Sequence, residues 1–586
     1  MQGRTFVAGG VVVLASVLAV AACDGDGDPA GTCTELSGTI EADRTLSDPC
    51  YRVTGQVYVP DDVAVTVAPG VTFHFEQDTG IEVNDQGSFH AAGTTDAPIT
   101  FTGVEARRGY WNGLHFSNAD SFQNALHHVV VEHGGAHDYG SGLRAGVYLG
   151  SSGYPVRCSI EDAVLRQNDG WGLALREEAV LESFARNELT ENADGPVHAF
   201  PPAVDQLEAT STYVGNDTDY VFVQGNYAGI LEDETWQDLD ADYLVEGEIF
   251  VHDPGHWTIA AGTRIVFRQN AGIEIDGAGA LTVAGTATAP VVLTGFEHVR
   301  GYWDGIRLTN ADSIHNALAW VTLEDGGAEE YTTGLRGGLF LDSSGYEVRC
   351  SVTNTTLRNN AGWGLYLRNE AVLPSFTDNT LTGNEFGPVF TYPPPVQYLS
   401  PTSTYTGNDV DFVFVQGNYG GIAGDETWEN LDADYLIGGT LAVETTGHLT
   451  LSAGAGLVFE QDAELDVTDD GALTAAGTAA DPVTFRGREA LAGYWNGILF
   501  TNANSLDNRL EHVDIAHGGG YAFVDGQPAN IALVSSGYPL QLRVTDSTIR
   551  DSAGWGIWAS AEATLNADVE TSNTFSGNVG GNVGRE

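Results

Sequence analysis

Short apolar segments separated by Gly, Asn and Asp run through most of the chain. Between residues 71 and 103, apolar and polar positions alternate with a period of two in segments near Val71, Ile81, Ser88 and Ile99. Such alternation is typical of short, half-buried β-strands. Beyond the N-terminal segment, no window has the apolar spacing of an amphipathic helix. The pattern therefore predicts an all-β protein without helical crossovers.

This strand pattern repeats at a long interval. The string GYWNGLHFSNADS at Gly109 returns as GYWDGIRLTNADS at Gly301 and as GYWNGILFTNANS at Gly493, each time 192 residues further on. A repeat of this length is either a domain or a block of several smaller coils. We divide the chain accordingly into copy 1 (51–242), copy 2 (243–434) and a truncated copy 3 (435–586).

Many short strands without helices fit a sandwich, a propeller or a β-solenoid. Two strings favour the solenoid: GALTVAGTATAPVVLTG from Gly279 and NTTLRNNAGWG from Asn354. They resemble the coils of right-handed parallel β-helices in the pectin-lyase-like superfamily. The resemblance covers most of residues 51–580 and implies a right-handed parallel β-helix, in which apolar side chains stack inward and Asn side chains at the bends bond along the axis.

The N-terminus predicts the compartment. An apolar run fills residues 5–22 after Arg4, and Val20-Ala21-Ala22-Cys23 resembles a bacterial lipobox. The resemblance implies a lipoprotein signal peptide over 1–22 and a lipidated Cys23. An ordinary secretory signal with an incidental Cys is the alternative. We expect a protein of the bacterial cell envelope that is extracytoplasmic, at the outer membrane and cell surface or in the periplasm, and held to the membrane by its lipid alone.

The segment that follows the signal peptide is acidic and contains two cysteines. Residues 23–35 are predicted to be a solvated tether, and residues 36–50 to cap the first coil. Cys33 and Cys50 flank a short segment in an oxidising compartment, which predicts a disulfide. In the chain-entropy model, closing a loop of this size stabilises the fold by roughly 3 kcal/mol.

Charge excludes one class of partner. The chain carries 80 acidic residues and 24 basic residues, all of them Arg, for a formal charge of −56. Binding to nucleic acid needs the opposite sign, so we expect no such partner. We also expect a monomer that requires no cofactor. Calcium suits so acidic a surface, but the sequence defines no set of metal ligands.

The superfamily includes enzymes that cleave acidic polysaccharides. A polygalacturonase-type set needs Gly-His-Gly and Arg-Ile-Lys strings, and a pectate-lyase site needs Arg-x-Pro-x-x-Arg; the sequence contains none of these. No catalytic residue is therefore assigned, and an enzyme is the less favoured hypothesis. The alternative remains a polysaccharide lyase or a glycoside hydrolase acting on acidic glycans.

Aromatic residues recur in every copy and suggest a binding function. Aromatic faces stack on sugar rings, and evenly spaced weak sites bind a polymer with avidity. The sequence therefore predicts surface interaction or adhesion through a carbohydrate or another envelope polymer. A structural spacer or coat is the third hypothesis, because the same aromatic residues could pack inside the tube. The candidate stacking residues are Tyr110, Trp111, Tyr302, Trp303, Tyr494 and Trp495.

Overall fold

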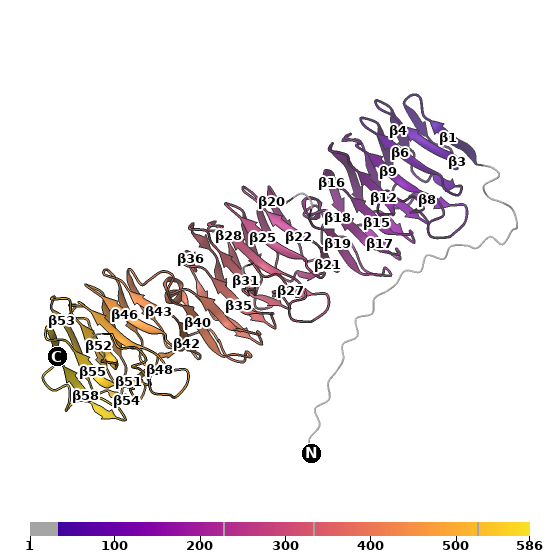
Figure 1. The fold of residues 1–586 in the computed structure, drawn as a ribbon. Coiled ribbons are helices and arrows are strands. Elements are labelled where there is room, and N and C mark those ends of the chain that lie inside the picture. The colour runs from indigo at the N-terminus through magenta and orange to yellow at the C-terminus, as the bar shows by residue number, and fades with distance from the viewer. Residues whose placement is uncertain (1–32, 227–228, 332–333, 524–526) are drawn as a thin grey trace, which may run out of the picture.

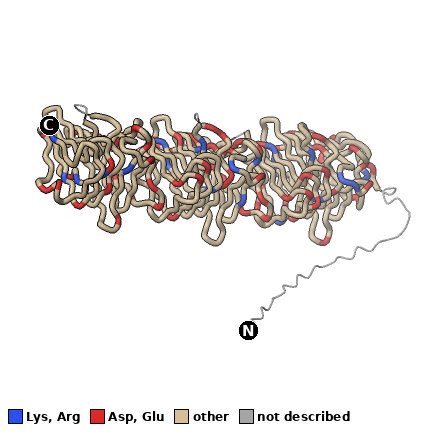
Figure 2. The backbone as a smooth tube through the Cα atoms, turned by 60° about the horizontal axis from the view of Figure 1, so that its bottom comes forward, with Lys and Arg blue, Asp and Glu red and all other residues tan. Residues whose placement is uncertain are grey.

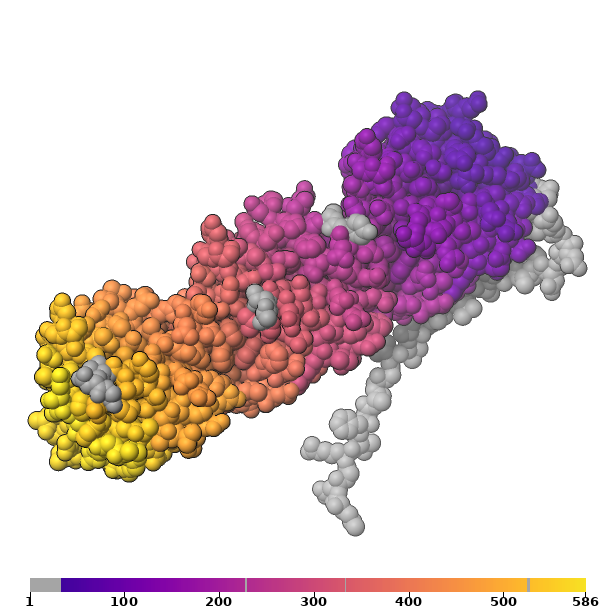
Figure 3. Space-filling view, in the orientation of Figure 1, coloured from indigo at the N-terminus to yellow at the C-terminus, as the bar shows by residue number. Residues whose placement is uncertain are grey.

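The computed structural model describes residues 33–226, 229–331, 334–523 and 527–586. These residues form a rod in which strands stack coil upon coil, with β1 (Thr34–Thr39) at one end and the C-terminus at the other (Figure 1). The colours follow one another in order along the rod (Figure 3), so residues far apart in the sequence lie far apart in space. The predicted signal peptide and Cys23 lie outside the described residues.

Each coil contributes strands at up to three positions around the rod. In copy 1 the position-1 strands are β3 (Cys50–Val59), β5 (Thr72–Phe75), β8 (Ile99–Gly103), β11 (Val129–Glu132), β14 (Val164–Arg166) and β17 (Glu188–Thr190). The position-2 strands are β6 (Gly80–Asn84), β9 (Gly113–Ser117), β12 (Ala145–Gly150), β15 (Trp171–Leu175), β18 (Gly195–Ala199) and β19 (Tyr220–Gln224). The position-3 strands are β2 (Arg44–Leu46), β4 (Ala64–Val67), β7 (Ser88–Ala92), β10 (Ala125–His127), β13 (Val156–Glu161) and β16 (Ala179–Ala185).

Copy 2 has the same order of strands. Position 1 holds β21 (Asp242–Glu246), β24 (Arg264–Phe267), β27 (Val291–Gly295), β30 (Val321–Glu324), β34 (Thr356–Arg358) and β38 (Thr380–Thr382). Position 2 holds β22 (Glu248–Val251), β25 (Gly272–Asp276), β28 (Gly305–Thr309), β31 (Gly337–Asp342), β35 (Trp363–Leu367), β39 (Gly387–Thr391) and β40 (Phe412–Gln416). Position 3 holds β20 (Asp233–Trp236), β23 (His256–Ile259), β26 (Ala280–Ala284), β29 (Ala317–Ala319), β32 (Val348–Arg349), β33 (Ser351–Thr353), β36 (Ala371–Val372) and β37 (Phe376–Thr377).

Copy 3 continues the order to the last described residue. Position 1 holds β42 (Asp434–Gly438), β45 (Gly456–Phe459), β48 (Val483–Gly487), β51 (Val513–Ala516), β54 (Thr548–Arg550) and β57 (Thr574–Ser576). Position 2 holds β43 (Thr440–Val443), β46 (Glu464–Thr468), β49 (Gly497–Thr501), β52 (Ala529–Val534), β55 (Trp555–Ala559) and β58 (Gly581–Arg585). Position 3 holds β41 (Asp425–Trp428), β44 (His448–Leu451), β47 (Ala472–Ala476), β50 (Arg509–Glu511), β53 (Leu540–Thr545) and β56 (Ala563–Leu565). The short helices α1 (Pro201–Val204) and η2 (Pro394–Tyr398) lie before the copy boundaries. Strands β20 and β41 also precede these boundaries in the sequence, but each pairs with a strand of the copy that follows.

The sheets change position where one copy meets the next. Strand β19, at position 2 of copy 1, pairs in parallel with β21, at position 1 of copy 2. The same exchange joins β40 of copy 2 to β42 of copy 3. Each boundary is therefore bridged by continuous backbone hydrogen bonds rather than by a linker.

Apolar rows inside the tube hold the coils together. The parallel register aligns Val147, Leu173, Val197, Val221 and Tyr243 on five successive coils. All five side chains are at most 1% exposed. Burying each stabilises the fold by roughly 1.5–3 kcal/mol, so the apolar rows are the main source of stability.

Asparagine side chains form a second, polar row at the bends. In copy 1, Asn168 Nδ2 donates to Asn192 Oδ1 at 2.9 Å, and Asn192 Nδ2 donates to Asn216 Oδ1 at 3.0 Å. In copy 2, Asn384 bonds in the same way between Asn360 and Asn408. These amides satisfy buried polar groups along the axis, and that explains the Asn-rich bends of the sequence.

The N-terminal end of the tube is covered by β1, which pairs in parallel with β3. Cys33 and Cys50 form a disulfide with a Cα–Cα distance of 4.9 Å, which ties this edge strand to the first coil.

Acidic residues are distributed along the whole rod (Figure 2). No helix in the described part of the chain is long and apolar enough to cross a membrane.

Candidate binding grooves

Rows of aromatic side chains lie on the outside of the position-2 strands. Successive residues of a strand point to opposite faces, so each inward apolar residue is followed by an outward one. The parallel register of the strands aligns these outward residues in rows, with about 4.8 Å between residues on neighbouring coils. The outer row of copy 1 is Tyr148, Ala174, His198, Phe222 and Leu244. The outer row of copy 2 is Phe340, Tyr366, Phe390, Phe414 and Leu436.

The outer row of copy 2 is a continuous aromatic stack. The ring centroids of Phe340 and Tyr366 are 3.9 Å apart, and those of Tyr366 and Phe390 are 5.0 Å apart. Phe414 continues the stack at 5.2 Å from Phe390. Tyr331, from the loop before β31, covers the other end at 4.7 Å from Phe340. The stack therefore forms a rigid apolar floor on the outside of the rod.

A groove of about 890 Å³ opens beside this stack. Phe390, Tyr392 and the exposed Tyr419 supply its aromatic walls. Arg368 reaches across it, and its Nη1 donates to the hydroxyl of Tyr392 at 3.2 Å. Asn369 also lines the groove, and its buried Oδ1 accepts no hydrogen bond from any described residue.

An equivalent groove of about 400 Å³ lies in copy 1, 192 residues earlier in the sequence. Its walls include Trp171, His198 and Phe200, where copy 2 has Trp363, Phe390 and Tyr392. The guanidinium carbon of Arg176 lies 4.7 Å from the centroid of the Phe200 ring. Burial, together with the charge of Arg176, lowers the pKa of His198 to about 4, so its imidazole is neutral at pH 7.

Both grooves combine the same types of group. Aromatic rings offer flat apolar faces, and Arg176 and Arg368 offer planar donors that match hydroxyl or carboxylate oxygens. Gln224 and Gln416 add amides at the same place in the two grooves. In copy 3 the corresponding outer row reads Ala532, Trp558 and Gly584, so the aromatic floor is not repeated there.

Copy 2 places two carboxylates close together at the start of its outer face. Glu248 and Asp304 both lie against Gly272, where a Cβ atom would be 2.8 Å from a Glu248 oxygen and 3.1 Å from Asp304 Cβ. Burial and the charge of Asp304 raise the pKa of Glu248 to about 8; burial and the charge of Glu329 raise the pKa of Asp304 to about 6. Copy 1 has Gln56 and Asn112 at these positions.

Substituting Glu248→Gln is expected to stabilise the protein at pH 7–8 by at least about 1 kcal/mol. The raised pKa means that the folded state holds a proton which the unfolded state has released. Below about pH 4 both states of the wild type hold this proton, and Glu248 costs no stability. As pH rises towards 8 the unfolded state releases the proton more readily than the folded state does, so the free energy of unfolding of the wild type falls. Urea denaturation of wild type and variant across this pH range measures the effect. Gln56→Glu, the reverse change in copy 1, is the matched control; equal pH dependence of wild type and Glu248→Gln would refute the prediction.

The three predicted stacking tryptophans are buried in the core, which corrects the sequence-based assignment. Trp111, Trp303 and Trp495 are each 0% exposed. Their rings stack inside the tube on Phe75, Phe267 and Phe459, and each indole donates to a backbone carbonyl oxygen. They cannot offer a face to a ligand. Tyr110 is also buried, at 6% exposed, and Tyr302 and Tyr494 are half-buried.

The groove residues were not identified from the sequence, although a signal was present. Strands such as GLYL at Gly364 and FVFVQ at Phe412 carry large apolar residues on both faces. A strand on the surface of a solenoid needs only one apolar face, so two-sided apolar strands mark a covered or ligand-binding exterior. Arg368, Tyr392 and Gln416 lie on three successive coils, so each is one coil away from the next in the sequence. The sequence alone therefore did not indicate that they are neighbours in space.

The match to a protein-family model agrees with the fold. Residues 229–346 match the model of the pectate-lyase-like beta helix domain. No curated protein matches the chain. One solved structure found by the search is described as a new PL6 alginate lyase complex with trisaccharide; it shares 11% identity over 93% of this chain and 80% of that chain, with a TM-score of 0.08, which is too low to support any argument. The parallel pairing of the strands and the family match of residues 229–346 together identify the protein as a parallel β-helix.

Proposed function

We propose that this β-helix binds a carbohydrate or another envelope polymer along the two grooves, and so serves in surface interaction or adhesion. The observation that carries the proposal is the repeated wall of aromatic rings with an arginine and amides beside it. Sugar rings stack on aromatic faces while their hydroxyls take hydrogen bonds from Arg and Gln. The pectate-lyase-like match of residues 229–346 supports a polysaccharide as the ligand class.

The test is to measure retention and cleavage together. The purified protein is incubated with a panel of neutral and acidic polysaccharides, and both bound polymer and newly formed chain ends are quantified. Retention without new ends supports binding as the function. Retention of no polymer contradicts the proposal and favours a structural spacer or coat.

Cleavage of an acidic glycan is the second candidate function, and the Glu248–Asp304 pair favours it. A carboxyl group that keeps its proton near neutral pH can act as a general acid, and a neighbouring carboxylate can act as a general base. Glu248 lies on β22 and Asp304 directly before β28, in the sheet that carries the groove of copy 2. Burial and the charges of Glu248, Glu329 and Asp304 raise the pKa of Tyr331, whose ring contacts Phe340 of the aromatic stack. New chain ends that disappear in Glu248→Gln, while retention persists, would establish this function over simple binding.

We further propose that Cys23 is lipidated and anchors the protein to a membrane of the bacterial envelope. The support is the lipobox-like string Val20-Ala21-Ala22-Cys23 after an apolar run. A Cys23→Ser variant is expected to leave the membrane fraction and the detergent phase, because several acyl chains are needed for stable anchoring. Fractionation of cells that produce each form measures this, and membrane retention of the Cys23→Ser protein would count against the anchor.

A further inference from the structure

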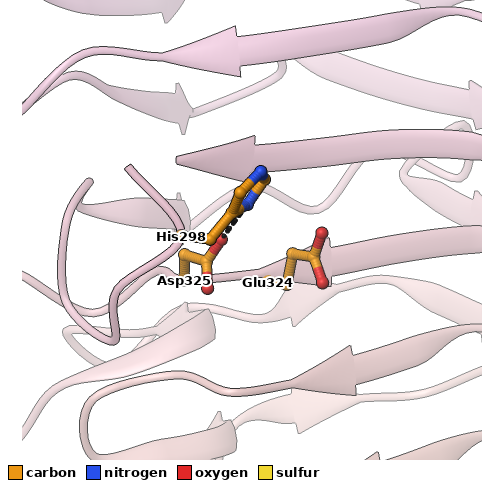
Figure 4. A group of neighbouring side chains, drawn as sticks. All are labelled: His298, Glu324 and Asp325. Carbon is orange, nitrogen blue, oxygen red and sulfur yellow. Dashed lines mark hydrogen bonds and ion pairs between the residues drawn. The ribbon is translucent and has the colours of Figure 1, made fainter. Parts of the chain in front are cut away.

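A second cluster of functional groups lies away from the grooves, at the end of β30 in copy 2. His298, Glu324 and Asp325 each offer one ligand atom, and these atoms all lie within 4.8 Å of one another. Figure 4 shows the imidazole of His298 directed at the carboxylate of Asp325, with Glu324 beside it. The side chain of Asp325 is 1% exposed, whereas that of His298 is 64% exposed. Asp325 therefore lies at the buried end of the cluster, and His298 lies at the end that is open to solvent.

Hydrogen bonds fix the side chains of the cluster, and the hydroxyl of Thr294 lies 3.2 Å from His298 Nδ1. Asp325 Oδ2 lies 3.1 Å from His298 Nδ1 and accepts a hydrogen bond from Thr294 at 3.0 Å. Asp325 Oδ1 accepts one from Asn359 at 2.5 Å. Glu324 accepts a hydrogen bond from Arg358 through Oε2 at 2.7 Å, and Oε1 has no part in this bond. Each carboxylate oxygen has more than one lone pair, so these bonds hold the ligands in place without saturating them.

The contact between His298 and Asp325 suits a transition metal with nitrogen and oxygen ligands. Zinc binds His nitrogen and carboxylate oxygen at about 2.0–2.2 Å, which sets neighbouring ligand atoms about 3 Å apart. The 3.1 Å between His298 Nδ1 and Asp325 Oδ2 meets this requirement. Three protein ligands and an exposed side leave a position for water. Arg358 offsets only one of the two carboxylates, so the cluster keeps a net negative charge that attracts a cation.

The repeat shows that this group belongs to copy 2. At the positions of His298 and Asp325, copies 1 and 3 have Ala106 with His133, and Ala490 with His517. All three bend residues have a left-handed backbone, with φ of 67°, 68° and 69°, so the chain takes the same path in each copy. Copy 2 therefore differs from the other two copies at both positions, and on the same backbone path its imidazole lies opposite a buried carboxylate.

We propose that His298, Glu324 and Asp325 bind a divalent transition-metal ion of the zinc type. The ion takes the place of the proton that otherwise bridges His298 Nδ1 and Asp325 Oδ2. This metal site is independent of the grooves and of the polymer proposed for them.

Zinc binding by the purified, chelator-treated protein tests the proposal. Calorimetric titration with zinc gives stoichiometry and affinity, and cobalt substitution adds an absorption spectrum that reports nitrogen and oxygen coordination. His298→Ala is expected to weaken binding at this site by more than about 100-fold, because loss of a ligand costs more than loss of a supporting contact. His298 is exposed, so the variant is expected to fold; its thermal unfolding in chelator is the check.

Two further variants make the result specific. His512→Ala removes the imidazole of the other His, Glu and Asp group, Glu511, His512 and Asp546, and is expected to leave the His298 site intact. Ala106→His with His133→Asp recreates the arrangement in copy 1, beside Thr102 and Glu132, and is expected to add one zinc ion per chain. Wild-type protein that takes up no zinc, or a His298→Ala protein with unchanged stoichiometry and affinity, would overturn the proposal. A double variant that gains no zinc would overturn the claim that these residues suffice.

Discussion

Replacing Trp303 with alanine is expected to lower the free energy of unfolding by about 3–5 kcal/mol. The indole is 0% exposed, stacks on Phe267 with ring centroids 4.1 Å apart and donates to the backbone oxygen of Glu324 at 2.7 Å. Its removal leaves a cavity in the tube and an unpaired carbonyl oxygen, and both effects destabilise the folded state. Urea denaturation followed by far-ultraviolet circular dichroism measures the loss.

The same experiment separates a core tryptophan from a ligand-binding one. Tyr346, which is 70% exposed in the same copy, provides the control, and Tyr346→Ala is expected to change stability by less than about 0.5 kcal/mol. Below its unfolding transition, Trp303→Ala is expected to retain polysaccharide as the wild type does. A Trp303→Ala protein of wild-type stability that has lost retention would restore the stacking role predicted from the sequence.

Removing one aromatic wall from each groove is expected to have the largest effect on polymer binding. Tyr392→Ala in copy 2 and Phe200→Ala in copy 1 should each weaken retention about tenfold, which corresponds to about 1.4 kcal/mol of lost stacking. The double variant should lose more than either single variant, because one polymer chain that spans both grooves binds with avidity. Titration of the retained polysaccharide against immobilised protein measures the three affinities.

Conservative and distant substitutions provide the controls for this series. Tyr392→Phe keeps the ring and loses only the hydroxyl that accepts from Arg368, so it should retain most of the affinity. Tyr154→Ala removes a tyrosine that is 66% exposed and does not line either groove, and it should bind as the wild type does. If Tyr154→Ala weakens binding as much as Tyr392→Ala does, then the polymer lies along the exposed tyrosines and not in the grooves.

Much of the fold could be predicted from local sequence. Period-two alternation indicated short strands, and the Asn-rich strings indicated bends; the structure has parallel strands and Asn192 bonded to Asn168 and Asn216 at those bends. These features are local, because whether a residue faces the core depends on its place in its own strand and bend. The large number of acidic residues and the absence of Lys likewise needed no structure.

The candidate sites required the coordinates. Trp303 and Tyr392 are both aromatic and both lie near glycines, yet the first is inside the tube and the second lines a groove. When both faces of a strand are apolar, the strand's own sequence does not determine which face points into the tube and which lies outside under a loop such as that of Tyr331.

The sequence by itself determined the all-β coil architecture, the repeat of 192 residues and the acidic surface, because periodicity, spacing and charge are properties of the chain. Only the tertiary structure decided the inward tryptophans, the two grooves, the Glu248–Asp304 pair and the His298–Asp325 contact. The physical reason is that a parallel solenoid brings together residues one coil apart, and the length of each coil depends on loops whose path is set by packing rather than by local sequence preference.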